Sequence, residues 1–98
     1  MAYKRTKALS ISRAVKEKVF ERDEYCVLCG SPNGLPNAHY IPRSQGGLGI
    51  EENIVTLCPE CHRKYDQTYE RPILKAKIKS YLQSKYENWN ENDLIYRR

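Results

Sequence analysis

Apolar side chains recur at helical spacing in two segments that flank the centre of the chain. Residues 12–22 carry a stripe that separates apolar from charged positions and predicts an amphipathic helix. Residues 72–86 carry a second stripe and predict another helix. We expect both stripes to be buried. The first consists of Ile11, Ala14, Val15 and Val19, and the second of Leu74, Ile78, Tyr81 and Leu82.

The middle of the chain shows the pattern of short strands and turns instead. Residues 35–41 and 53–57 predict two strands, and Pro42 ends the regular pairing of the first. Three glycines in the loop at 43–49 indicate a hairpin connection. Pro59 suits the first turn of a helix, because its missing N–H has no helical partner there. We expect that helix to run to about Tyr65.

The two ends of the chain lack a sustained apolar pattern. Residues 1–11 are basic and polar and predict a flexible arm. In the tail from residue 87, Trp89, Leu94 and Ile95 are candidates for docking on the domain, whereas the polar run at 90–93 argues against a long helix. The sequence predicts neither a membrane span nor a secretory signal, which makes the cytoplasm the expected location.

Length and charge restrict the class of protein. A chain of 98 residues forms one domain and buries a modest fraction of its surface, so a bound metal is a sensible supplement to the core. The net charge is +5, and both ends are basic while residues 23–61 carry one arginine against five acids. Basic flanks suit a polyanion such as nucleic acid, but a solvated basic surface explains the same charges.

Four cysteines form two CxxC pairs, Cys26 with Cys29 and Cys58 with Cys61. Each pair offers two sulfurs from a tight turn, and the 28 residues between the pairs form a loop that brings them together, which predicts a tetrahedral structural zinc site. A redox dithiol leaves the second pair without a role. Haem attachment at the CxxCH of residues 58–62 leaves the first pair without one.

Two segments around the second cysteine pair carry a resemblance to a known family. HYIPRSQGG at residues 39–47 and ENIVTLCPECH at 52–62 follow each other in order. Together they resemble the HNH endonuclease signature in its four-cysteine form, as found in short HNH proteins of bacteriophages and their hosts. The resemblance covers roughly residues 15–69. It implies an α+β fold in which a two-stranded hairpin packs on a helix around a metal, the ββα-metal unit.

The resemblance also implies roles for individual residues. His39 would be the general base that activates water, which suits a side chain whose ordinary pKa is about 6.5. Asn53 would tie the hairpin loop and orient the base. His62 would bind a catalytic divalent ion, and Asp66, four residues further along the same helix face, would be a second ligand. A carboxylate suits Mg²⁺ and, by the same chemistry, Mn²⁺.

One position departs from the family pattern. Many members carry Asp or His immediately before the general base as a further metal ligand, and this chain has Ala38. Water and substrate phosphate would have to complete the coordination, which Mg²⁺ tolerates. The sequence therefore predicts weak binding of the catalytic ion before DNA arrives.

Several of these residues also have a purely structural interpretation. A lone histidine such as His39 is commonly a hydrogen-bonded structural residue, and His62 is a conceivable substitute for a cysteine at the zinc site. Asp66 is equally a surface acid near a helix end. Arg43, Arg63 and Lys64 flank the site and are candidates for binding phosphates, although charged residues beside a loop are common.

The sequence thus leads to two functional hypotheses. In the first, residues 12–70 form a metal-dependent nuclease domain that hydrolyses DNA, with the basic helix and tail of 71–98 packed on it and a structural zinc in addition to the catalytic ion. In the second, the same zinc-stapled fold is a noncatalytic module that binds nucleic acid or a phage packaging protein, with its metal site weakened at Ala38. The pattern does not indicate an oligomeric state.

Overall fold

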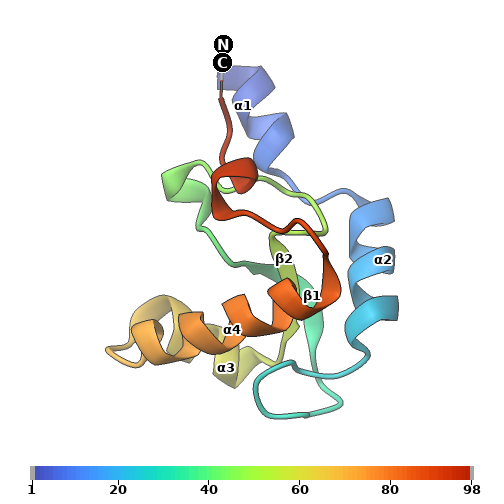
Figure 1. The fold of residues 1–98 in the computed structure, drawn as a ribbon, viewed down its shortest axis with the longest axis vertical. Helices are drawn as coiled ribbons and strands as arrows, with labels where there is room; N and C mark the ends of the chain where they lie inside the picture. Colours follow the sequence, from blue (N-terminus) through green and yellow to red (C-terminus); the bar gives the residue numbers. More distant parts are fainter. Residues whose placement is uncertain (1, 98) are drawn as a thin grey trace.

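The computed structural model describes residues 2–97, and its elements follow the order helix, helix, strand, strand, helix, helix (Figure 1). The α+β class and the hairpin predicted from the sequence are confirmed. The helices are α1 Ala2–Leu9, α2 Arg13–Asp23, α3 Pro59–Gln67 and α4 Arg71–Lys85, the strands are β1 Leu35–His39 and β2 Ile54–Leu57, and two short 3₁₀ turns are η1 Arg43–Gln45 and η2 Glu91–Leu94.

The hairpin forms the centre of the molecule. β1 and β2 pair in antiparallel register, with Ala38 opposite Val55 and His39 opposite Ile54, and the register shifts between Leu35 and Ala38. Every residue of β2 is buried. α2 packs against both strands, whereas α3 packs against β2 and α4 lies on α3 (Figure 1). The strand that carries His39 is therefore held by α2, which precedes the family signature, and by its pairing with β2.

Buried side chains from the hairpin and from the helices form the core. α2 begins at Ser12, whose side chain accepts a hydrogen bond from the backbone N–H of Val15 at 3.2 Å and so caps the helix. Helices α3 and α4 contribute fully buried side chains to the same cluster as the hairpin. Members of this cluster include Ala38, Tyr40, Val55, Leu57, Tyr65, Ile78, Leu82 and Leu94.

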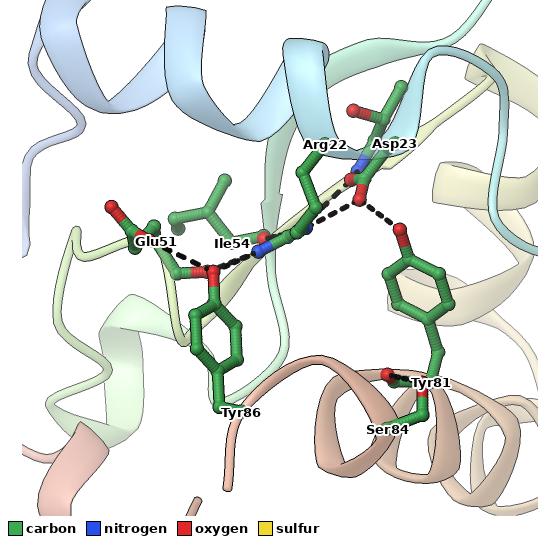
Figure 2. Close-up of polar contacts among 8 residues, drawn as sticks. Arg22, Asp23, Glu51, Ile54, Tyr81, Ser84 and Tyr86 are labelled. Atoms are coloured by element: carbon green, nitrogen blue, oxygen red, sulfur yellow. Dashed lines mark hydrogen bonds and ion pairs between the residues drawn. The ribbon is translucent and has the colours of Figure 1, made fainter.

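A buried ion pair joins α2 to the hairpin and to α4 (Figure 2). Arg22 and Asp23 contact each other at 2.6 Å, and the Asp23 side chain is fully buried. Its carboxylate accepts hydrogen bonds from the backbone N–H of Thr56 at 2.9 Å and from the hydroxyl of Tyr81. The Arg22 guanidinium donates to the Glu51 carbonyl at 2.8 Å, the Ile54 carbonyl at 2.7 Å and the Tyr86 hydroxyl at 2.8 Å.

The N-terminal segment differs from the flexible arm expected from its sequence. Residues Ala2–Leu9 form helix α1, and Leu9 at its end is only 2% exposed. Residues 2–9 lack a broad apolar stripe, so the pattern gave no signal for a helix that rests on the domain mainly through its last turn.

The C-terminal tail docks on the domain, as the apolar residues in it predicted. The Trp89 indole N–H donates to the Glu52 carbonyl at 2.8 Å, and its ring meets Tyr40 edge-on at 5.5 Å between centroids. Leu94 is buried, and Ile95 forms a β-bridge with Gly47. No helix in the described part of the chain is both long and apolar enough to span a bilayer.

Candidate metal centre and active site

The four cysteines come together at the end of the hairpin where α3 begins. Their sulfur atoms all lie within 4.8 Å of one another, and the Cys29 and Cys58 sulfurs are 3.7 Å apart. Four sulfurs at zinc–sulfur distances of about 2.3 Å would stand about 3.8 Å apart at the corners of a tetrahedron. Cys58 is the N-cap of α3, and the backbone N–H of Cys61 points to its sulfur at 3.4 Å. The donor set therefore fits a structural zinc.

The mutual repulsion of four closely spaced thiolates favours a bound cation. All four cysteines are free of disulfides. Burial, and then the hydrogen bonds from the other three thiols, raise the pKa of Cys61. Four thiolates at this spacing repel one another unless a dication binds them. Within residues 2–97, these cysteines are the one group of three or more His, Cys, Asp or Glu side chains with metal-binding geometry.

His39 lies at the last position of β1 and faces a surface pocket of about 480 Å³. The pocket is lined by His39, Pro42, Arg43, Ser44, Asp66 and Arg71. The ring is partly buried, and its Nε2 lies 2.9 Å from the Leu9 carbonyl oxygen. Burial lowers the pKa of His39, the Leu9 carbonyl raises it, and the nearby Arg43 charge lowers it again. The net effect lowers the pKa of His39, which favours the neutral imidazole at pH 7.

His62 and Asp66 form a pair on the face of α3 beside this pocket. The His62 Nε2 lies 3.0 Å from Asp66 Oδ2, and both side chains are partly exposed. Asp66 also lines the pocket with His39, and Arg71 approaches its other carboxylate oxygen at 3.9 Å. The structure thus brings the two expected ligands of the catalytic ion together and places one of them in the same pocket as the expected base.

Asn53 is fully buried and ties the loop that carries Arg43. Its side-chain oxygen accepts from the Ile41 N–H at 2.9 Å, while its amide donates to the carbonyls of Ile41 at 3.2 Å and Leu48 at 2.9 Å. Gly47 allows this close packing, because a Cβ there would lie 1.7 Å from the Ile41 carbonyl oxygen. These contacts hold both ends of the loop at a fixed distance from His39.

The basic residues divide between the pocket and the outer surface. Arg43 lines the pocket, whereas Arg63 and Lys64 lie outside its lining, and Lys64 stands 3.9 Å from Glu60 on the same helix. Their expected contacts with nucleic acid stay predictions. Arg71 was not predicted from the sequence, yet it lines the pocket. Its guanidinium stacks 4.2 Å from the Tyr65 ring centroid and donates to the Tyr65 carbonyl at 2.9 Å.

Ala38 contributes nothing to this site. Its side chain is fully buried in the apolar core beside the hairpin's other inward-facing residues. The position that supplies a further ligand in many relatives of the signature is here a packing position. His62 and Asp66 are the two donors that the sequence predicts for a second ion, and that role stays a prediction.

The hairpin, the following helix, the four-cysteine centre and the histidine-bearing pocket together define a small zinc-stapled domain of the nuclease type. Residues 26–68 match the family described as HNH endonuclease. Over 55 residues the chain is 40% identical to Anaredoxin of Nostoc sp. (strain PCC 7120), a match that covers 54% of this chain and 72% of that protein. The chain belongs to the HNH endonuclease family.

Proposed function

We propose that the protein is a metal-dependent endonuclease that hydrolyses DNA phosphodiester bonds. The observation that carries the proposal is the convergence of His39, Arg43, Asp66 and Arg71 on one open pocket, with His62 paired to Asp66 at its side. A neutral base, two guanidinium groups and a carboxylate–imidazole pair are the groups that phosphodiester hydrolysis needs. Family membership supports nuclease-type chemistry in general, and the pocket supports these specific roles.

His39 is the general base of the proposed reaction. Its ring lines the pocket, and its lowered pKa keeps it neutral near pH 7. It takes a proton from a water molecule that attacks the phosphorus atom. A divalent ion such as Mg²⁺ or Mn²⁺, held by His62 and Asp66, would supply Lewis-acid stabilisation of the phosphate charge.

The two arginines of the pocket bind the substrate phosphate in this proposal. Arg71 is held by its stacking on Tyr65 and its bond to the Tyr65 carbonyl, so its guanidinium is oriented before DNA arrives. Arg43 lies on the loop that Asn53 fixes. Guanidinium groups bind phosphate oxygens bidentately, which compensates for the small number of protein ligands on the metal ion.

The structural zinc has a separate task. Cys58 and Cys61 belong to the turn that starts α3, the helix that carries His62 and Asp66. Zinc bound at the four cysteines would fix this helix on the hairpin and so set the distance between the ion ligands and His39.

A noncatalytic module is the second candidate, and the burial of Ala38 in the core favours it, because the ion keeps only two protein ligands. Calorimetric titration of the zinc-loaded protein with Mn²⁺, with and without a DNA oligonucleotide, separates the two. The endonuclease binds a second ion at least when DNA is present. The module binds none in either condition.

Plasmid relaxation tests the proposed reaction. Supercoiled DNA is incubated with the zinc-loaded protein in Mg²⁺, in Mn²⁺ and without added divalent ion, and nicked and linear products are measured separately. We expect relaxation that requires the divalent ion and is lost in His62→Ala. Equal relaxation by the intact protein and by this variant, at matched zinc content, would contradict the proposal.

A further inference from the structure

Helix α1 lies outside the matched family segment, yet its last turn contacts the candidate active site. The last carbonyl groups of a helix have no partners within the helix. Two of those in α1 find partners in the site: the Ala8 carbonyl accepts from the Gly49 N–H at 3.0 Å, and the Leu9 carbonyl meets His39 Nε2 at 2.9 Å. The end of α1 is therefore capped by the loop and by the candidate base.

The close approach of α1 depends on Gly49. A Cβ at that position would lie 2.1 Å from the Ser10 carbonyl oxygen and 3.0 Å from that of Leu9. The Leu9 side chain is 2% exposed and anchors the turn from the other side. A glycine on the loop and a buried leucine on the helix thus fix the position of the carbonyl group that reaches His39.

We propose that the Leu9 carbonyl is a positioning group that holds the His39 ring with its proton on Nε2, leaving Nδ1 as the proton acceptor. A carbonyl oxygen only accepts, so a hydrogen bond at this distance requires Nε2 to carry the proton. The inference rests on the proposed function, because it assigns which ring nitrogen of that base reacts. It makes the N-terminal helix part of the active site.

The proton balance of the step follows directly. The attacking water gives one proton to His39 Nδ1, its oxygen forms the new bond to phosphorus, and the bond from phosphorus to the leaving oxygen breaks. The leaving oxygen takes its proton from solvent water. His39 then carries a proton on each nitrogen, and the Leu9 carbonyl keeps its bond to Nε2–H and stabilises the imidazolium, as does its place at the negative end of α1.

The contact can be observed without any reaction. The zinc-loaded protein, labelled with ¹⁵N in histidine and ¹³C in the leucine carbonyl, is examined by NMR at pH 8, where a histidine of ordinary pKa near 6.5 is neutral. We expect an Nε2–H proton of His39 that exchanges slowly with water and couples to the Leu9 carbonyl carbon. The chain has two histidines, so His39→Ala identifies the signal.

Gly49→Ala tests the positioning role, and Ser10→Ala is the matched control. The first variant forces the turn away from the loop, whereas the second removes only a hydroxyl that bonds to the Thr6 carbonyl at 2.7 Å. We expect Gly49→Ala to lose the protected proton and to lower kcat about tenfold, with KM within about twofold, a part of the total contribution of a general base. We expect Ser10→Ala to keep the protected proton and the kcat of the intact protein.

Three results would overturn the inference: a His39 proton on Nδ1 in the intact protein, an unchanged kcat in Gly49→Ala after the protected proton is lost, or a rise in kcat, which would mean that α1 obstructs the base. The NMR signal separates this inference from the proposed function. A protein that shows the coupling to Leu9 but relaxes no plasmid would refute the endonuclease, whereas a nuclease without the coupling would refute only the role of α1.

Discussion

His39 carries most of the chemistry proposed for the pocket, and its surroundings determine the pH at which it acts. Burial disfavours the charged imidazolium, and the positive charge of Arg43 disfavours it further. The Leu9 carbonyl and Asp66 act in the opposite direction but do not reverse the net lowering of the pKa. The pKa of His39 therefore lies below the ordinary value for histidine.

The pH profile of cleavage follows from this balance. Because the base must be neutral, kcat/KM rises as His39 loses its proton, and a lowered pKa places the midpoint of that rise below pH 6.5. Arg43→Gln removes a nearby positive charge, so its midpoint should move upward. Initial plasmid-nicking rates between pH 5 and 9 measure both. A midpoint above 6.5 in the intact protein would show that another group governs the rate.

Arg71 provides a second test at the level of single residues. We expect Arg71→Gln to reduce kcat/KM by about 10- to 100-fold, because a charged contact with the substrate phosphate is lost from the pocket. Arg63→Gln is the matched control, since that side chain is exposed and lies outside the pocket lining. Cleavage of a labelled duplex at several DNA concentrations measures both variants. Equal losses of kcat/KM in the two variants would show that Arg71 acts only through the general surface charge.

Cysteine spacing and the HNH signature are local patterns, so the sequence was sufficient to predict the zinc ligands and to suggest His39, Asn53 and His62. The residues that surround His39 could not be predicted in the same way. Leu9 and Arg71 lie outside the signature and reach the pocket only through tertiary packing. A short-range pattern of residue types does not predict which backbone carbonyl or guanidinium reaches the pocket from 30 or more positions away in the sequence.

At the level of elements, the hairpin and the three longer helices follow from their apolar and turn patterns and from Pro59, which suits the first turn of α3. The structure places the ends of these elements within about two residues of the predicted positions. Helix α1 was missed because it has only eight residues, and isolated helices of that length are unstable without tertiary contacts. The docked end of α1 supplies those contacts.

The Arg22–Asp23 pair should contribute strongly to stability, because it fastens α2 to β2 and α4. Asp23→Ala leaves a partly buried guanidinium without its partner and the Thr56 N–H without its acceptor. We expect the free energy of unfolding to fall by about 3–5 kcal/mol. Glu17→Ala, which breaks an ion pair on the exposed face of α2, should change it little. Urea unfolding followed by circular dichroism compares them, and similar values for the two would refute the fastening role.

The zinc centre should be required for α3 to hold its place. In Cys58→Ser we expect loss of bound zinc and a largely unfolded domain, since metal affinity and folding are coupled in domains of this size. Glu60→Gln, a change at an exposed position of the same helix, is the control. Mass spectrometry measures the metal content of both variants, and circular dichroism measures their helical signal. A folded, soluble and zinc-free Cys58→Ser protein would contradict a structural zinc.

Considered as a whole, the molecule holds the loop between β1 and β2 with both of its flanks (Figure 1). Gly49 donates to the Ala8 carbonyl in the N-terminal helix, while Leu48 donates to the Leu94 carbonyl at 2.8 Å in the C-terminal turn. Tyr96 donates back to the Gly46 carbonyl at 2.7 Å. The basic flanks, whose charge suits either a polyanion or a solvated surface, therefore also shape the loop between β1 and β2.

The most direct test of His39 as the general base is the rate of plasmid nicking by the intact protein and by His39→Ala, measured in Mg²⁺ at matched zinc content and matched DNA affinity. We expect the intact protein to nick the plasmid and the rate to fall by about 10²- to 10⁴-fold in the variant, the usual contribution of a general base. Equal rates in the two proteins would contradict this role of His39.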